Sequence, residues 1–322
     1  MGIFANPLTD LLEYEDFSRD FLKGTDPVGM TGCIDSEKVH FMSTFLGEKK
    51  VQLVVTYSEQ RAREIEEDYK LFCSQVYVIP PRDLIFFSAD LQGNAIIAER
   101  MKAFAALYQN EAKVIITTMD ALMSAAVPFE QLMSHVIKLK EGDELDLEKL
   151  KHDLTVMGYE RVGRVEEPGQ FTVHGGIADV YPLTMEVPVR IELWGDEIDT
   201  IRCFEPQSQR SMDQIECVSV FPAAEVIADD TARRRAAGMI QNELESQLAV
   251  FKKAKEPDKA KRLREETNRI LEALGEDVVL EAPDSYISYF YPRTVQLSEY
   301  FDEKNTLVFL DLSLIHISEP TR

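Results

Sequence analysis

The chain has 322 residues, 45% of them hydrophobic, and a formal net charge of −22 at pH 7. This length and apolar content support two packed domains and exclude an intrinsically disordered chain. The negative charge makes the chain as a whole a poor binder of nucleic-acid backbones and suits it to a basic protein partner.

No apolar run approaches the ~20 residues that a membrane helix needs, and the first residues lack a secretory signal pattern. We therefore expect a cytoplasmic protein with no membrane contact. The four cysteines have no C-x-x-C spacing, which favours reduced thiols over disulfides or a zinc site. The histidines lack metal-binding spacing, and no nucleophile is paired with a base. We expect no metal site and no catalytic residue.

Residues 1–127 alternate strand and helix patterns and form the first predicted domain. The continuous apolar run Val51–Thr56 is typical of a strand covered on both faces. Further strands are predicted at Val76–Ile79 and Val114–Thr117, with one helix after its N-cap Ser58 and another over Asn94–Tyr108. This β-α-β order predicts an α/β fold with a doubly wound parallel sheet.

Residues 128–213 form a second predicted domain, inserted into the first. An apolar strand pattern over Phe129–Leu139 precedes a predicted helix at Asp143–Met157. From Gly158 to Arg210, short runs alternate apolar and polar residues between Gly, Pro and Asp, which predicts a small antiparallel β meander. Trp194-Gly195-Asp196 separates two such runs and predicts a hairpin turn.

Residues 214–311 form the third predicted segment, which contains a helical hairpin and returns to the first sheet. Its predicted elements are a helix at Thr231–Lys255 capped by Asp229 or Asp230, a helix at Asp258–Leu274 ended by Gly275, a strand at Ser285–Phe290, a short helix at Val295–Tyr300 and a strand at Thr306–Leu310. Residues 312–322 are expected to be a non-native tail.

A degenerate phosphate-binding loop precedes the first strand. The stretch Gly29-Met30-Thr31-Gly32-Cys33-Ile34-Asp35-Ser36 aligns with the pattern G-x-x-x-x-G-K-[ST]. Ile34 occupies the place of the second glycine and Asp35 that of the lysine. An anion in place of a cation about 4 Å from a phosphate changes attraction into repulsion. We expect Gly29, Gly32, Ile34, Asp35 and Ser36 not to bind nucleotide; the alternative is an unrelated turn.

Three segments carry a family resemblance: GYERV from Gly158, GQFTVHGGIADVYP from Gly169, and VRIELWGDEIDTIRCFEPQSQRS from Val189. They are similar to the second domain of the excision-repair protein UvrB and of the transcription-repair coupling factor family. The lost phosphate loop resembles the coupling factors, since UvrB keeps an intact one. The resemblance implies a truncated, N-terminal, UvrB-like module.

In this family the second domain binds UvrA, and the resemblance implies a UvrA-binding role for Arg161, Phe171, His174, Arg190 and Glu192. Thr172 and His174 occupy positions where UvrB has two arginines, which suggests a less basic contact. From the residues alone, Arg190 and Glu192 indicate a solvated cross-strand pair. Phe171 shares its face with Val173, which favours a core position.

The resemblance further implies recruitment of UvrA to RNA polymerase stalled at DNA lesions, in transcription-coupled nucleotide excision repair. The ATP- and magnesium-dependent translocase motor, and the contacts with RNA polymerase and double-stranded DNA, would lie beyond residue 322, leaving this chain without cofactor or catalysis. One alternative is a divergent UvrB-type excinuclease subunit with residual ATP binding. Another is a DNA-binding module at residues 233–269, a stretch that contains eleven Lys and Arg but only six Asp and Glu.

Overall fold

The computed structural model describes residues 8, 14–24, 26–82, 91–227, 229–275 and 286–311. The expected tail, residues 312–322, lies outside the described residues. The chain divides into two compact units. Unit 1 comprises residues 1–81, 106–123 and 301–322, and unit 2 comprises residues 82–105 and 124–300. Unit 1 contains a parallel sheet and unit 2 a larger antiparallel sheet, so the predicted α/β class is confirmed.

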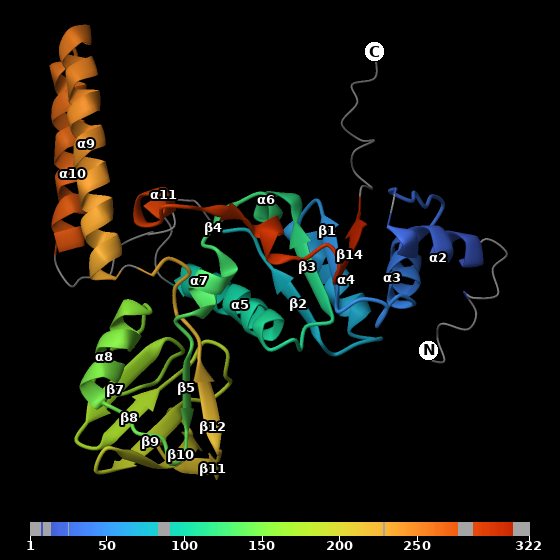
Figure 1. Ribbon diagram of the computed structural model, residues 1–322, viewed down its shortest axis with the longest axis horizontal. Helices are drawn as coiled ribbons and strands as arrows, with labels where there is room; N and C mark the ends of the chain where they lie inside the picture. The colour runs from blue at the N-terminus through green and yellow to red at the C-terminus, as the bar shows by residue number, and fades with distance from the viewer. Residues whose placement is uncertain are drawn as a thin grey trace. The chain divides into compact units, whose positions relative to one another are not determined.

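The sheet of unit 1 has four parallel strands in the order β14-β1-β3-β2 (Figure 1). Their bounds are β1 Val51–Thr56, β2 Val76–Ile79, β3 Val114–Thr118 and β14 Thr306–Leu310. Every residue of β1 and β3 is buried, as expected of central strands in a parallel sheet. The predicted return of the last strand is confirmed, because β14 pairs with β1 from Val51↔Thr306 to Val55↔Leu310.

The helices of unit 1 include α2 (Tyr14–Lys23), α3 (Asp35–Ser43), α4 (Glu59–Tyr69) and α6 (Met119–Leu122). Ser58 caps α4 as predicted, since its side chain accepts a hydrogen bond from the Arg61 amide. Ile65 and Tyr69 of α4 pack with Val54 and Ile116 in one core cluster. The long helix α5 (Leu91–Tyr108) connects β2 to β3 along the chain.

The main sheet of unit 2 has six strands in the order β11-β10-β9-β8-β7-β6. Their bounds are β6 Glu160–Arg161, β7 Gln170–His174, β8 Ile177–Val180, β9 Val189–Trp194, β10 Glu197–Phe204 and β11 Ser211–Gln214. Neighbours pair antiparallel except β6 with β7, so the predicted meander is confirmed. The predicted hairpin turn joins β9 to β10, with Gly195 at φ +67°, a conformation that glycine adopts without strain.

One face of this sheet packs against α8 (Leu147–Val156), capped by Asp146. Leu150 and Leu154 join Phe171, Ile191 and Ile201 in a continuous core. A second small sheet pairs β12 (Cys217–Val220) with β5 (Ile137–Lys140), and so joins residues on both sides of position 213.

Two predicted strands are helical in part. Phe129–Leu139 divides into helix α7 (Phe129–Met133) and strand β5. Of the predicted strand Ser285–Phe290, residues Ile287–Phe290 form helix α11, and Ser285 lies outside the described residues. Both segments are short, and their apolar residues are spaced as on one helix face: the buried Leu132 and Met133 lie three and four positions after the half-buried Phe129, and the buried Phe290 lies three positions after Ile287. Short apolar runs do not distinguish helix from strand.

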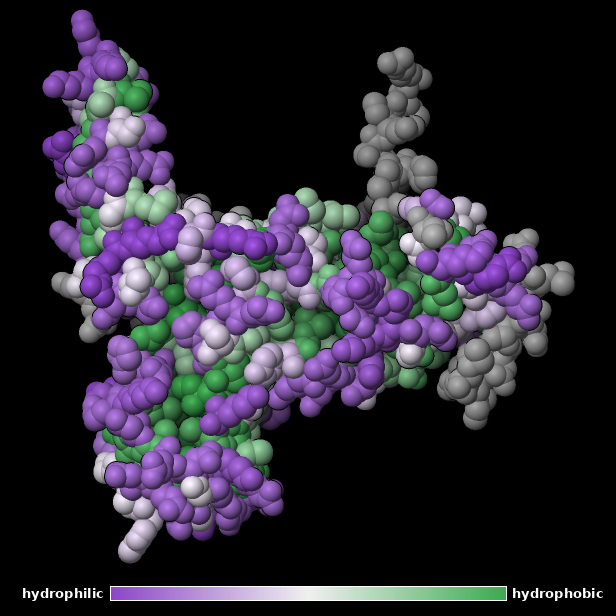
Figure 2. All heavy atoms as spheres, in the orientation of Figure 1, coloured by the Kyte–Doolittle hydropathy of each residue, from purple (hydrophilic) through white to green (hydrophobic). Residues whose placement is uncertain are grey.

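The predicted helical hairpin is present as α9 (Asp230–Ala254) and α10 (Pro257–Gly275) (Figure 1). The Asp229 carboxylate caps α9 by accepting from the Ala232 amide, and Lys255 ends it in the left-handed conformation. Hydrophilic side chains cover most of the hairpin's visible surface (Figure 2). The short strands β4 (Ala125–Ala126) and β13 (Val295–Gln296) pair, and the 3₁₀ helix η2 (Leu297–Tyr300) follows β13.

Candidate functional site

The strand register of unit 2 separates the predicted partner-binding residues into two faces. Phe171 pairs with Val180, and both point into the core against α8. Phe171 is 0% exposed, so its predicted contact with a partner is wrong: the ring fills the core that holds the sheet to α8. His174 and Ile177 form another pair of the same two strands and lie on the opposite, outward face.

Arg190 lies on the outward face, but its guanidinium is already bound. Nε and Nη2 each donate to one carboxylate oxygen of Asp179 at 2.7 Å, in a two-pronged pair. The guanidinium also lies 4.7 Å from the centre of the Phe204 ring. The hydrogen bonds to Asp179 raise the pKa of Arg190 above its ordinary value. This geometry holds the sheet together and leaves Arg190 little freedom to bind a partner.

Glu192 and His174 keep more of their surfaces available. Glu192 accepts a hydrogen bond from the Thr200 hydroxyl at 3.3 Å and is half-buried. His174 is exposed, and its Nδ1 lies 2.9 Å from the Thr172 hydroxyl. Both therefore have polar atoms that can turn toward a bound protein.

Arg161 is exposed at the edge of the sheet. Its strand β6 pairs in parallel with β7, and the register places Arg161 beside Phe171 rather than beside Arg190. No ion pair of Arg161 is found among the residues that the structure describes. The structure therefore brings His174, Arg190 and Glu192 onto one face and leaves Arg161 at the rim.

The stretch that aligns with a phosphate loop leads directly into α3. Residues 26–34 carry no helix or strand, and Gly32 has φ +87°. Ile34 is the residue before the helix, and its amide donates to the Glu37 carboxylate at 3.2 Å. A carboxylate thus occupies one of the free amides at the helix start, where a bound phosphate would otherwise accept.

Asp35 belongs to a network of ion pairs at this corner of unit 1. Its carboxylate lies 3.0 Å from Lys38 Nζ and 3.4 Å from Arg61 Nη2. The same two cations reach Asp311 at the end of β14, each at 3.1 Å. Burial lowers the pKa of Lys38, but the hydrogen bonds to Asp35 and Asp311 outweigh burial and raise it. Both cations are therefore bound by carboxylates of the chain itself.

Residues 137–225, the β5–β12 region just described, match the family model "UvrB interaction domain". Nearly the whole chain aligns with transcription-repair-coupling factors: 29% identity over 98% of this chain with the protein of Bacillus subtilis (strain 168), and 30% over 94% with that of Staphylococcus haemolyticus (strain JCSC1435). The chain is similar to the transcription-repair-coupling factors. It spans about a quarter of the length of these relatives, 27% and 26% respectively.

The match to the UvrB interaction domain ends beside a buried ion cluster in this coupling-factor relative. Glu225 Oε1 accepts from Arg100 Nε at 2.5 Å, and its other oxygen accepts from Arg82. Arg100 and Glu225 are 0% and 3% exposed. Burial raises the pKa of Glu225, but the nearby Arg100 and Arg82 lower it by a larger amount, so that the pKa is about 2. The cluster therefore joins the end of the matched region to α5.

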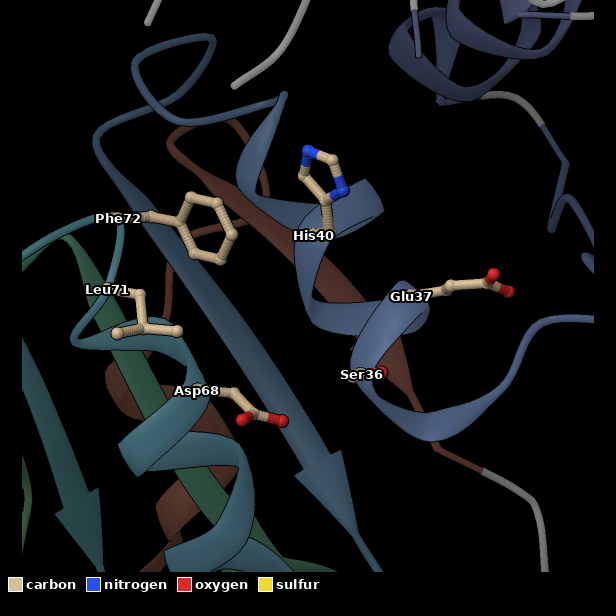
Figure 3. Close-up of a pocket in the computed structure, with 6 residues that line it drawn as sticks. All are labelled: Ser36, Glu37, His40, Asp68, Leu71 and Phe72. Carbon is tan, nitrogen blue, oxygen red and sulfur yellow. The ribbon is translucent and has the colours of Figure 1, made fainter. Parts of the chain in front are cut away.

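A pocket of about 480 Å³ lies between α3 and the end of α4 in unit 1. Figure 3 shows Ser36, Glu37 and His40 on α3 and, on the other side of the pocket, Asp68, Leu71 and Phe72; the Glu37 carboxylate points away from them. His40 and Phe72 stack at 5.5 Å between ring centres. The lining combines apolar carbon with two carboxylates, a serine and a histidine. Within the described residues no group of His, Cys, Asp and Glu is arranged to hold a metal ion.

The end of the α9–α10 hairpin gathers positive charge in this otherwise acidic relative of the coupling factors. Its exposed cations are Lys252, Lys253, Lys255, Lys259, Lys261, Arg262 and Arg264. Lys259 pairs with Glu256 at 2.9 Å and Lys261 with Glu265 at 3.8 Å, both exposed pairs that contribute little stability. No helix among the described residues is long and apolar enough to cross a membrane.

The sequence interpretation missed Trp194 as a surface feature. It is 84% exposed at the β9–β10 turn. The alternation along β9 contained the signal: Trp194 lies two positions after Glu192 and four after Arg190, and so belongs to their face. The partners Asp179 and Asp311 were also missed, since nothing local in the sequence links them to Arg190 or to Asp35.

Proposed function

We propose that this chain is the UvrA-recruiting part of a transcription-repair coupling factor. The observation that carries the proposal is the folded UvrB interaction domain, whose outward sheet face holds the exposed His174 and the half-buried Glu192. In the whole protein, this domain would bring UvrA to RNA polymerase stalled at DNA lesions. ATP-driven translocation on double-stranded DNA, with its ATP and magnesium, and the polymerase contact would belong to regions outside this sequence, in the cytoplasm.

Direct binding of purified UvrA to the immobilised chain tests this proposal. We expect saturable binding that is weakened by the paired substitutions Arg161→Glu and Glu192→Lys. Reversal of Arg190 is a poor test, because it would leave Asp179 without its partner. Glu303→Gln, an exposed residue of unit 1, is the matched control. Absence of UvrA binding by the unsubstituted chain would refute the proposal.

The proposal includes the absence of nucleotide binding at residues 29–36. Support comes from the carboxylates of Asp35 and Glu37 at the start of α3 and from the pairing of Lys38 and Arg61 with Asp311. Titration calorimetry with ATP and magnesium is expected to give no heat of binding. We expect Asp35→Lys alone not to create a site, because Ile34 still replaces the second glycine of the loop. Measurable ATP affinity would instead favour a divergent UvrB-type subunit.

The positive end of the α9–α10 hairpin supports a second candidate function, contact with DNA phosphates. Such a contact would weaken steeply with rising salt. A mobility shift with duplex DNA at two salt concentrations, compared between the unsubstituted chain and Lys252→Glu/Lys255→Glu/Arg262→Glu, measures it. Equal mobility of the two proteins at low salt would exclude DNA binding by the hairpin.

A further inference from the structure

The pocket between α3 and the end of α4 has one carboxylate that faces into it. Its volume of about 480 Å³ falls within the range of about 300–1,000 Å³ that is typical of ligand pockets. Asp68, near the end of α4, points its carboxylate toward α3, whereas the Glu37 carboxylate points away (Figure 3). Glu37 accepts a hydrogen bond from the Ile34 amide instead. Asp68 is therefore the acid that a ligand in this pocket would meet.

The cations of α4 and its C-cap leave the Asp68 carboxylate without a partner. Each of them pairs with another acid, in the contacts Arg61–Glu64, Arg63–Glu66 and Lys70–Glu66. Asp68 and its neighbour Glu67 form no ion pair and no side-chain hydrogen bond among the residues that the structure describes. The pocket thus keeps a negative charge that remains available to a cationic ligand.

The walls of the pocket are flat and partly apolar. The Phe72 and His40 rings lie nearly parallel, with 10° between their planes and 5.5 Å between their centres. Both rings are half-buried, and the Leu71 side chain at the same pocket is 76% exposed. A guanidinium is planar, so it can stack on an aromatic ring while its N–H groups reach a carboxylate, whereas the ammonium of lysine is a compact point charge. The lining therefore favours arginine over lysine.

We propose that this pocket binds an arginine side chain from a basic segment of a partner protein, stacked on Phe72 and paired with Asp68. Charge complementarity favours this occupant, because a chain with a net charge of −22 attracts basic proteins and repels nucleic acids. The exposed Leu71 favours a peptide over a small cation, because it offers apolar contact beside the charged group. The pocket lies in unit 1, outside the matched residues 137–225, so its occupant is independent of UvrA binding.

The test measures binding of the fluorescein-labelled peptide Gly-Leu-Arg-Leu-Gly to the full chain by fluorescence anisotropy at low salt. The same peptide with citrulline in place of arginine keeps the side-chain shape without the charge, and we expect it to bind about fivefold or more weakly. Asp68→Asn is expected to weaken the arginine peptide by a similar factor and to remove the difference between the two peptides. Glu67→Gln is the matched control, because it removes the same charge from the next residue, outside the pocket lining; we expect a change of less than about twofold.

Three results of this titration would overturn the proposal. The first is equal binding of the arginine and citrulline peptides by the unsubstituted chain, or no binding of either at about 1 mM. The second is an equal loss in Asp68→Asn and Glu67→Gln, which would show attraction to the acidic helix as a whole. The third is binding of acetylarginine amide as tightly as the peptide, which would show a site for a small cation.

A second copy of this chain is the remaining occupant, since its α9–α10 hairpin exposes Arg262 and Arg264. Sedimentation velocity at rising protein concentration tests it. We expect no self-association that depends on Asp68. Self-association that Asp68→Asn abolishes would assign the pocket to the chain's own arginine and overturn the proposal of a separate partner protein.

Discussion

The sheet end at Trp194 and the corner around Asp35 differ in how their charged side chains are paired. At the corner, Lys38 and Arg61 are bound by Asp35 and Asp311 of the chain itself. At the sheet end, an indole faces solvent among acids without ion pairs in the described residues. The comparison teaches that two charged regions of one chain can differ in whether their side chains find ion-pair partners within the chain: those at the corner do, and the acids at the sheet end do not among the described residues.

Among the ion pairs described above, we expect the buried Glu225 cluster to contribute most to the free energy of unfolding. Glu225→Gln removes the carboxylate that contacts both Arg82 and Arg100, and Arg100 has no exposed surface. We expect a loss of about 3 to 5 kcal/mol in the free energy of unfolding of unit 2. Urea unfolding followed by circular dichroism measures it, with the exposed Glu216→Gln as control. A loss below 1 kcal/mol would show that the cluster contributes little to the stability of unit 2.

The same cluster predicts an acid dependence. The pKa of Glu225 is lowered from an ordinary value of 4.5 to about 2 by Arg100 and Arg82, against burial. A lowered carboxyl pKa adds stability above the unfolded-state value, and this stability is lost as the pH falls from 4.5 toward 2. The contribution is on the order of 3 kcal/mol. The unfolding free energy at pH 3 and pH 6 is expected to differ less in Glu225→Gln.

We expect the next largest loss of stability from breaking the ion pairs of Asp311 with Lys38 and Arg61 in unit 1. Asp311→Asn removes the carboxylate that contacts Lys38 and the nearly buried Arg61. Because Asp35 still lies near both cations, we expect a loss of about 2 kcal/mol. Chemical unfolding measures this loss against Asp26→Asn, an exposed control in the same unit. An unchanged stability would mean that the corner is held by packing alone.

The outward face of the sheet in unit 2 contains one ion pair, between Arg190 and Asp179, among the residues described. Asp179→Asn breaks the two-pronged contact with Arg190, whose side chain is 20% exposed and can partly reach water. A loss of about 1 to 2 kcal/mol follows from that partial exposure. Denaturation measures the loss, and Asp199→Asn on the next strand is its control. A loss as large as that of Glu225→Gln would contradict this ranking.

Trp194→Ala should have the smallest effect on stability. The side chain removes little apolar area from water in the folded chain, so we expect a change within about 0.5 kcal/mol. A thermal melt followed by circular dichroism checks this. A destabilisation above 2 kcal/mol would show that the indole packs on the fold.

Local patterns sufficed to predict much of this fold. The continuous run at Val51–Thr56, the alternation of β7 to β10, and the caps Ser58 and Asp229 each depend on residues close in sequence. The partner of each charged side chain could not be predicted in this way. Asp311 lies 250 positions from Arg61, and only the return of β14 to β1 brings them together. The burial of Phe171 followed from strand parity, whereas the UvrA-binding role rested on resemblance.

The pairing of β1 with β14 has a consequence for synthesis of the chain on the ribosome. At about 5 to 20 residues per second, the 250 positions between Arg61 and Asp311 correspond to roughly 12 to 50 seconds of translation. During that interval one edge of β1 has no partner strand, and every strand of the antiparallel sheet in unit 2 is synthesised before β14. Nascent unit 1 is therefore the part of the chain that a chaperone would need to shield, because an open strand edge promotes aggregation.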